Sequence, residues 1–285
     1  MIGIHHSGGD GAALTGALAV TGVRGRLRRI GAVVLRDYYV LRRSLPRLLE
    51  IVYWPLVEVL IWGYVSLFLQ ANRLPTIMAV LLGGILLWQV LYRSQETVTV
   101  AFLEDIWSRN LLNVFTAPLA ATEYLAGVIV FGLLKLIAGT AVMAALAFLL
   151  YGFGLLRVGP ELVPFVFLLL VMGWSLATLT IGIILRFGQS AEIVAWAMAF
   201  AFQPFSAVFY PVDVLPAGMQ AVAHLVPASY IFEGMRAALA GEGVVWGNLG
   251  AAAGLDVLYA AGAVWFMARM LAHVRRNGGL SRFGE

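Results

Sequence analysis

Apolar stretches of about twenty residues recur along this 285-residue chain, and they limit its possible folds more than any other feature. An α-helix rises about 1.5 Å per residue, so roughly twenty apolar residues cross the hydrocarbon core of a bilayer. Only 12% of the residues are charged, about half the usual share in soluble domains, so a water-soluble enzyme is excluded. The sequence therefore predicts an all-α integral membrane protein.

Six of these stretches are long enough to be predicted as transmembrane helices. They cover about residues 51–69, 77–102, 124–150, 162–185, 193–209 and 249–271, within a six-span domain over 51–272. Fifteen of the eighteen arginines fall in or beside the segments that are inside if the N-terminus is inside. Because Lys and Arg favour the cytoplasmic side, we expect both termini, including the tail 273–285, to be cytoplasmic.

The N-terminal segment before the first span divides into two parts. Residues 1–23 show no firm periodicity and are expected to form a flexible tail, whereas residues 24–50 favour an amphipathic helix at the membrane surface. This basic helix serves either to set the topology or to recognise lipid. Its arginines alternate with apolar residues and are Arg24, Arg26, Arg28, Arg29, Arg36, Arg42, Arg43 and Arg47.

The cytoplasmic connection between the second and third spans has an unusual pattern. It begins with Glu104 and Asp105, continues through Trp107 and Arg109, and stops at Pro118, a residue that ends helices. Residues 104–118 thus favour a short helix parallel to the membrane. Such a helix either docks a cytoplasmic partner or is an ordinary interfacial helix.

A second unusual segment, residues 211–247, precedes the last span. Pro211, Pro216 and Pro227 divide it into two short helical stretches, about 219–225 and 230–239. It is either an outer loop or a re-entrant pair of helices that caps a pathway. Its few charges, including Glu233 and Arg236, favour the re-entrant arrangement.

Three ionisable residues lie within the predicted spans. Glu58 and Lys135 are expected at similar depth and could pair with each other, while Asp256 is expected nearer the outer interface. Charges in lipid are costly, so each indicates either a structural ion pair or a substrate or proton site.

Several chemistries are excluded by counting. The chain has no cysteine, its four histidines are scattered, and no metal, cofactor or catalytic set is predicted. A P-loop needs Gly-Lys-Ser/Thr, but the single lysine is flanked by Leu134 and Leu136. Two alternatives remain open: an ion-coupled secondary transporter, although no internal repeat is found, and a membrane-embedded enzyme, for which His224 is the remaining candidate.

Two stretches of the sequence carry a family resemblance. One runs from Glu104 through Pro118 to Glu123 and Gly127, and the other runs from Phe202 through Pro211, Leu-Pro216 and Leu-Val-Pro227 to Glu233-Gly-Met-Arg236. Over about residues 25–275 the chain resembles the permeases of ABC-2 type transporters. Gln203-Pro204 departs from the Ser/Gly-rich stretch of many members, which leaves the substrate subgroup open.

The resemblance implies a division of labour between subunits. Residues 104–118 would be a coupling helix that docks on a separate P-loop ATPase through Glu104, Asp105, Trp107 and Arg109, and the basic helix would also contact that ATPase. Residues 211–239 would be gate helices. Two permeases would pair as a homodimer in a bacterial inner membrane, and two ATPases binding ATP and Mg²⁺ would drive export of a glycan, glycolipid, lipid or drug-like molecule.

Overall fold

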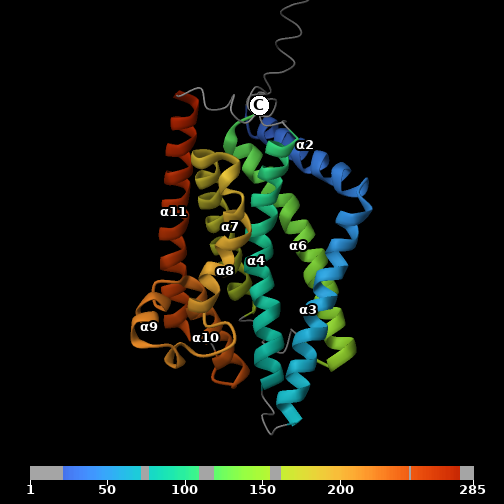
Figure 1. The fold of residues 1–285 in the computed structure, drawn as a ribbon, viewed down its shortest axis with the longest axis vertical. Helices are drawn as coiled ribbons and strands as arrows, with labels where there is room; N and C mark the ends of the chain where they lie inside the picture. The colour runs from blue at the N-terminus through green and yellow to red at the C-terminus, as the bar shows by residue number, and fades with distance from the viewer. Residues whose placement is uncertain (1–21, 72–76, 109–118, 155–161, 244, 277–285) are drawn as a thin grey trace, which may run out of the picture.

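The computed structural model describes residues 22–71, 77–108, 119–154, 162–243 and 245–276. Within these ranges the chain consists of α-helices, short 3₁₀ helices and turns, with no strand (Figure 1). This confirms the all-α class. The predicted tails are outside these ranges, apart from residues 22–23 and 273–276.

The basic segment forms its own helix, but its boundary differs from the predicted one. α2 (Val23–Arg42) ends at Arg42, and α3 (Leu45–Ala71) begins two residues later. Pro46 lies in the first turn of α3, where a missing N–H costs nothing. Residues 45–50 therefore begin the spanning helix, whereas the sequence assigned them to the interfacial helix.

α7 (Leu162–Phe187) is the most enclosed helix, and it packs along both α4 (Ile77–Trp107) and α11 (Trp246–Arg276). The contact with α4 depends on Gly173. A Cβ at this position would lie 2.7 Å from the carbonyl oxygen of Leu91 and would overlap the Ser94 hydroxyl. Only glycine therefore allows α4 and α7 to approach this closely.

Four of the described helices are long and apolar enough to cross a membrane: α3, α6 (Ala121–Tyr151), α7 and α11. In an apolar stretch of 18 residues taken from each helix, 56% of the residues of α7 are buried, against 22% in α3 and 17% each in α6 and α11. The last three present large exposed apolar side chains such as Phe68, Phe148 and Trp265. Such faces are suited to lipid or to another membrane helix.

The fifth predicted span, 193–209, is shorter than expected. α8 (Ile193–Phe202) has ten residues and continues only through a 3₁₀ turn to Phe205. Pro204 lies in that turn, and Ala207 has a φ of 54°, so the helix cannot continue. This stretch alone does not cross a bilayer, and the six-span count is not confirmed.

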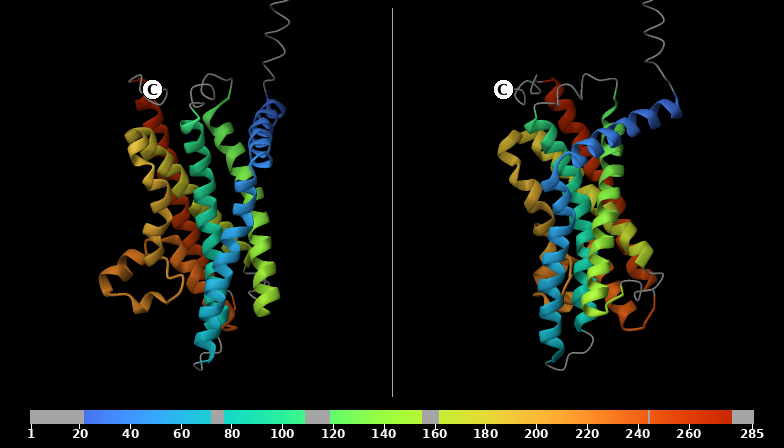
Figure 2. Two further views of the ribbon diagram at one scale, coloured as in Figure 1. Left: turned by 45° about the vertical axis from the view of Figure 1, so that its right-hand side comes forward. Right: turned by 90° about the vertical axis from the view of Figure 1, so that its right-hand side faces the viewer.

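The two ends of the bundle differ. α2 and the C-terminal end of α11 lie at one end, while α9 (Ala217–Ala223) and α10 (Pro227–Leu239) lie at the other (Figures 1 and 2). Two short helices thus occupy the segment for which two were predicted.

Candidate functional site

α2 lies across the ends of α4 and α6 and is held there by ion pairs (Figure 2). Arg29 donates to both carboxylate oxygens of Glu123, at 2.8 Å from Nε and 2.7 Å from Nη2. Glu123 also accepts the backbone N–H of Ala120 at 3.1 Å, within the first turn of α6. The fork-shaped guanidinium matches the carboxylate, so this contact fixes both distance and orientation.

A second contact joins α2 to the last turns of α4. Arg36 donates to both oxygens of Asp105 at 3.2 and 3.3 Å, and the Tyr124 hydroxyl donates to Asp105 at 2.6 Å. The guanidinium carbon also lies 5.8 Å from the centre of the Tyr124 ring. Asp105 is only 6% exposed, so its charge is satisfied within the chain.

The charges on α2 around this contact influence each other. Burial lowers the pKa of Arg36, but the carboxylates of Asp105 and Asp37 outweigh it and hold that pKa above its ordinary value. Burial also raises the pKa of Asp37, and Arg36, whose Nε donates to it at 2.8 Å, offsets this only in part. Arg36 thus stays charged, as its contact with Asp105 requires.

Close packing completes the attachment of α2. A Cβ on Gly127 of α6 would lie 2.6 Å from the Cβ of Val33, which is itself buried. Arg47, at the start of α3, pairs with Glu104 at 3.0 Å, and both side chains are more than a third exposed. α2 is therefore attached by apolar packing at Val33, by ion pairs to the buried Glu123 and Asp105, and by the more exposed Arg47–Glu104 pair just after it.

The predicted coupling residues occupy different positions from those expected. Glu104, Asp105 and Trp107 belong to the last turns of α4, so a separate helix does not begin at residue 104. Trp107 is half-exposed, and its indole N–H donates to Glu192, just before α8, at 2.7 Å. Arg109 and the rest of the segment to Pro118 lie outside the described residues.

These contacts are made by residues that precede and follow the segment 109–118 in the chain. Its preceding turn is bound to α2 through Asp105 and its following turn through Glu123. Trp107 adds a contact to the connection between α7 and α8. The described turns on both sides of residues 109–118 are therefore joined to α2, and the turn before them is also joined to the connection that precedes α8.

The sequence analysis assigned Glu104 and Asp105 to contact with a partner subunit and missed their contacts within the chain. Asp105 binds Arg36 and Tyr124, and Glu104 binds Arg47. One available signal was the spacing of Arg29, Val33 and Arg36, which places two arginines and an apolar residue on the same face of a helix. Nothing in the sequence indicated Glu192 as the acceptor for Trp107.

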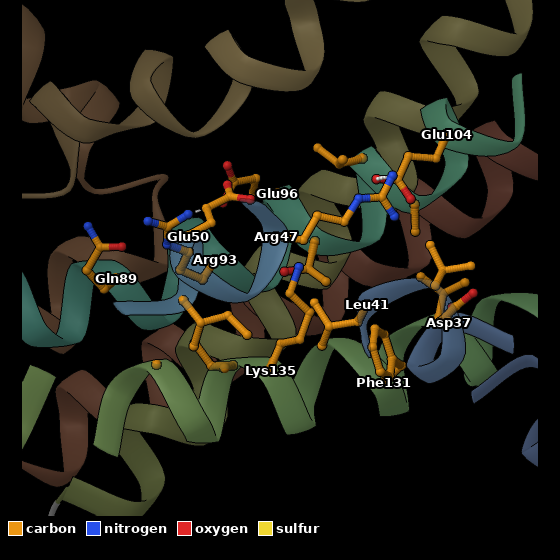
Figure 3. A pocket seen from close by; sticks show the side chains of 18 of the residues that line it. Asp37, Leu41, Arg47, Glu50, Gln89, Arg93, Glu96, Glu104, Phe131 and Lys135 are labelled. Carbon is orange, nitrogen blue, oxygen red and sulfur yellow. Dashed lines mark hydrogen bonds and ion pairs between the residues drawn. The ribbon is translucent and has the colours of Figure 1, made fainter. Parts of the chain in front are cut away.

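Glu58 and Lys135 do not form the predicted pair. Among the described residues, no ion pair within 4.0 Å joins them, and Glu58 Oε2 is buried without a hydrogen bond. Lys135 instead lines a charged cavity of about 400 Å³ between α2, α3, α4 and α6 (Figure 3). Asp256 is 1% exposed, and neither of its oxygens has a hydrogen-bond partner among the described residues.

At the other end of the bundle, Glu233 and Arg236 of α10 bind backbone. Glu233 accepts the N–H of Val212 at 2.8 Å, Arg236 donates to the carbonyl of Ala207 at 2.7 Å, and the two side chains pair at 2.9 Å. The three prolines each precede or open a short helix: Pro211 caps the 3₁₀ turn Val212–Val214, Pro216 caps α9, and Pro227 begins α10.

The geometry is that of a membrane bundle whose one end carries an attached basic helix. Among the described residues no group of three His, Cys, Asp or Glu side chains could hold a metal ion. The family model described as "ABC-2 type transporter" matches residues 38–240. A search of curated proteins found no match to the chain.

Proposed function

Because the chain belongs to the ABC-2 type transporter family, we propose that this integral membrane protein is the permease subunit of an ABC exporter. In the proposal, two copies form the pathway in a bacterial cytoplasmic membrane, with both termini cytoplasmic. Two separate P-loop subunits bind ATP and Mg²⁺ and hydrolyse the ATP. The exported molecule would be a glycan, glycolipid, lipid or drug-like amphiphile.

One observation carries the mechanism: both turns that flank 109–118 are bound to α2. If this segment docks on the ATPase, closure of the ATPase dimer would push on it. Asp105 would pass the movement to Arg36, and Glu123 would pass it to Arg29. Because α3 follows α2 after a two-residue turn, the first spanning helix would move as well.

In this proposal Glu104 and Asp105 position α2, whereas Trp107 and Arg109 remain for contact with the ATPase. Trp107 is accessible to a partner because 49% of its surface is exposed, whereas Asp105 is buried. The α9–α10 segment would serve as the gate at the opposite end, with Glu233 and Arg236 fixing its connection to α8.

The test is charge reversal in vesicles that contain the chain and its cognate ATPase. Arg29→Glu or Glu123→Arg alone should reduce stimulation of ATP hydrolysis and transport, and the double exchange should restore a large part of both. Arg269→Glu is the control because Arg269 is also an exposed arginine but belongs to α11 instead of α2. Unchanged coupling in both single variants would refute transmission through α2.

Transport itself needs a control for its energy source. A partner ATPase with its P-loop lysine replaced should abolish export while the permease remains folded. Export that continues on an ion gradient alone would overturn the ABC assignment in favour of a secondary transporter.

A further inference from the structure

The charged cavity has two chemically different walls (Figure 3). Residues of α4 line one wall at intervals of three or four, and most of them are polar, among them Gln89, Arg93 and Glu96, with Glu104 one turn beyond Val100 and Ala101. Across from them, α6 contributes apolar residues, including Phe131 and Leu136, around Lys135. Its volume of about 400 Å³ falls in the range of small-molecule sites, and its walls suit an amphiphile.

Most charges that line the cavity neutralise each other. Arg36 pairs with Asp37 and Asp105, Arg47 pairs with Glu104, and Arg93 pairs with Glu96 at 2.7 Å. In the part of the chain that the structure describes, Lys135 forms no ion pair and no hydrogen bond. Among the described residues, Lys135 and Glu50 are therefore the two lining charges without an ion pair, and Glu50 is exposed whereas Lys135 is partly buried.

Lys135 lies near the middle of the 31-residue helix α6 and extends into the cavity (Figure 3). A charged side chain at such a depth is costly unless it has a partner or water. The carboxylates of Asp37 and Glu104 line the same cavity, but neither lies within 4.0 Å of the Lys135 ammonium. An anionic group between these walls would supply the missing partner.

The cavity also has an unused acceptor. Asp37 binds Arg36 through one oxygen, while its other oxygen is buried and accepts no hydrogen bond from any described residue. The hydroxyls of Thr97 and Thr140 lie in the lining and could donate to an anion. With five acidic and four basic side chains in the lining, a purely anionic ligand would meet excess negative charge, whereas a ligand carrying both signs would not.

The position of the cavity identifies where such a ligand comes from. Its walls include α3 and α6, two helices whose apolar faces are mostly exposed at the surface of the bundle. Ile51, Pro55 and Met143 line the cavity beside the polar groups and suit a hydrocarbon chain. A membrane lipid therefore has both the access and the chemistry.

We propose that this cavity binds one zwitterionic phospholipid, with its phosphate at Lys135 and its primary ammonium at Asp37. The acyl chains would lie against the apolar side chains of α6 and α3. The proposal concerns a lipid that stays bound to the chain, and it does not depend on which molecule the complex exports.

The test is native mass spectrometry of the full chain in detergent with equal amounts of phosphatidylethanolamine, phosphatidylcholine and phosphatidylglycerol with matched acyl chains. One phosphatidylethanolamine should remain per chain, about tenfold more often than phosphatidylglycerol, since a charge-assisted contact is worth about one factor of ten. Phosphatidylcholine should be intermediate because its quaternary ammonium cannot donate to Asp37. Equal retention of the three lipids would overturn the proposal.

Variants locate the bound lipid. Lys135→Met should abolish specific retention, Lys135→Arg should keep it, and Asp37→Asn should reduce the preference for phosphatidylethanolamine over phosphatidylglycerol. Arg269→Gln, at an exposed position of α11 outside the cavity lining, is the control and should change nothing. Loss with Lys135→Arg, or the wild-type preference in either Lys135→Met or Asp37→Asn, would contradict the site, so the test still gives a result if one variant misfolds.

The outcome is distinguishable from that of the transport assay. Headgroup preference in a chain that fails to stimulate its ATPase would refute the proposed function and leave the lipid site standing. ATP-driven transport without headgroup preference would do the reverse.

Discussion

The two ends of the bundle are held by different chemistry. At the α2 end, side chains bind side chains on other helices: Arg29 binds Glu123, and Arg36 binds Asp105. At the α9–α10 end, side chains bind backbone: Arg236 reaches the carbonyl of Ala207, and Glu233 reaches the N–H of Val212. Further side chains donate to backbone carbonyls there, among them Gln220, Ser229, Tyr230 and Tyr259.

This difference has mechanical consequences. Ion pairs between helices act over a range of distances and can re-form after a small displacement, so they suit a part that moves. Bonds to backbone fix one loop conformation, here one that includes Ala207 with a φ of 54°, in the left-handed region that non-glycine residues rarely occupy. We therefore expect the α2 end to respond to charge and salt and the α9–α10 end to respond to loss of individual hydrogen bonds.

The largest effect is expected from Arg236→Met. It removes the bond to Ala207 and leaves Glu233 without its cation, and the Arg236 side chain is only 16% exposed. The free energy of unfolding should fall by about 2–4 kcal/mol, which would appear as a lower melting temperature in detergent. Arg269→Met, at an exposed position of α11, is the control. Equal stability of the two variants would mean that backbone bonding does not hold this end.

An intermediate effect is expected from Asp105→Asn. The amide can still accept the Tyr124 hydroxyl but no longer balances the charge of Arg36, so attachment of α2 should weaken by about 1–2 kcal/mol. Faster hydrogen exchange in α2, with unchanged exchange in α10, would show it. A double-mutant cycle with Arg36→Gln should give a coupling energy of similar size, and additivity would argue against a direct interaction.

Asp37→Asn provides the contrast on the same helix. Since burial raises the pKa of Asp37, its folded form binds a proton more tightly than the unfolded chain does. The contribution of the Asp37 side chain to stability is thus greatest at low pH, where it is protonated, and falls as pH rises through the raised pKa. At neutral pH, Asp37→Asn should therefore cost less stability than Asp105→Asn, and a larger cost would contradict the assignment of Asp105 as the main anchor.

The smallest effect is expected from Arg47→Gln. Both partners of the Arg47–Glu104 pair are more than a third exposed, so the loss should be about 0.5 kcal/mol or less. Raising the salt concentration from 0.15 to about 1 M should erase the difference from wild type, because the screening length falls to about 3 Å. A salt-independent loss would indicate packing by the side chain instead of an ion pair.

A considerable part of the fold was predictable from local patterns. Long apolar runs predicted α3, α6, α7 and α11, and alternating arginines predicted a basic helix before the first span. Prolines predicted two short helices before the last span, and α9 and α10 begin two and three residues earlier than predicted. The length of α8 was overestimated because the apolar stretch was taken to be helical throughout. Pro204 and the backbone at Ala207 end this helix although the sequence remains apolar.

The candidate site was less predictable because its contacts join distant residues. Arg36 and Asp105 are 69 positions apart, and Arg29 and Glu123 are 94 apart. Residue type shows that an arginine needs an acid but not which acid lies within reach. For the same reason, similar depth suggested a Glu58–Lys135 pair, although depth does not fix the rotation of either helix.

The sequence by itself determined that this is a membrane protein with a basic helix and without its own P-loop, because hydropathy, charge and a missing motif are local properties. Only the tertiary structure decided that Glu104 and Asp105 bind α2 and that Lys135 faces a cavity. These outcomes depend on how helices rotate and cross, and close packing at glycines such as Gly127 and Gly173 sets that geometry.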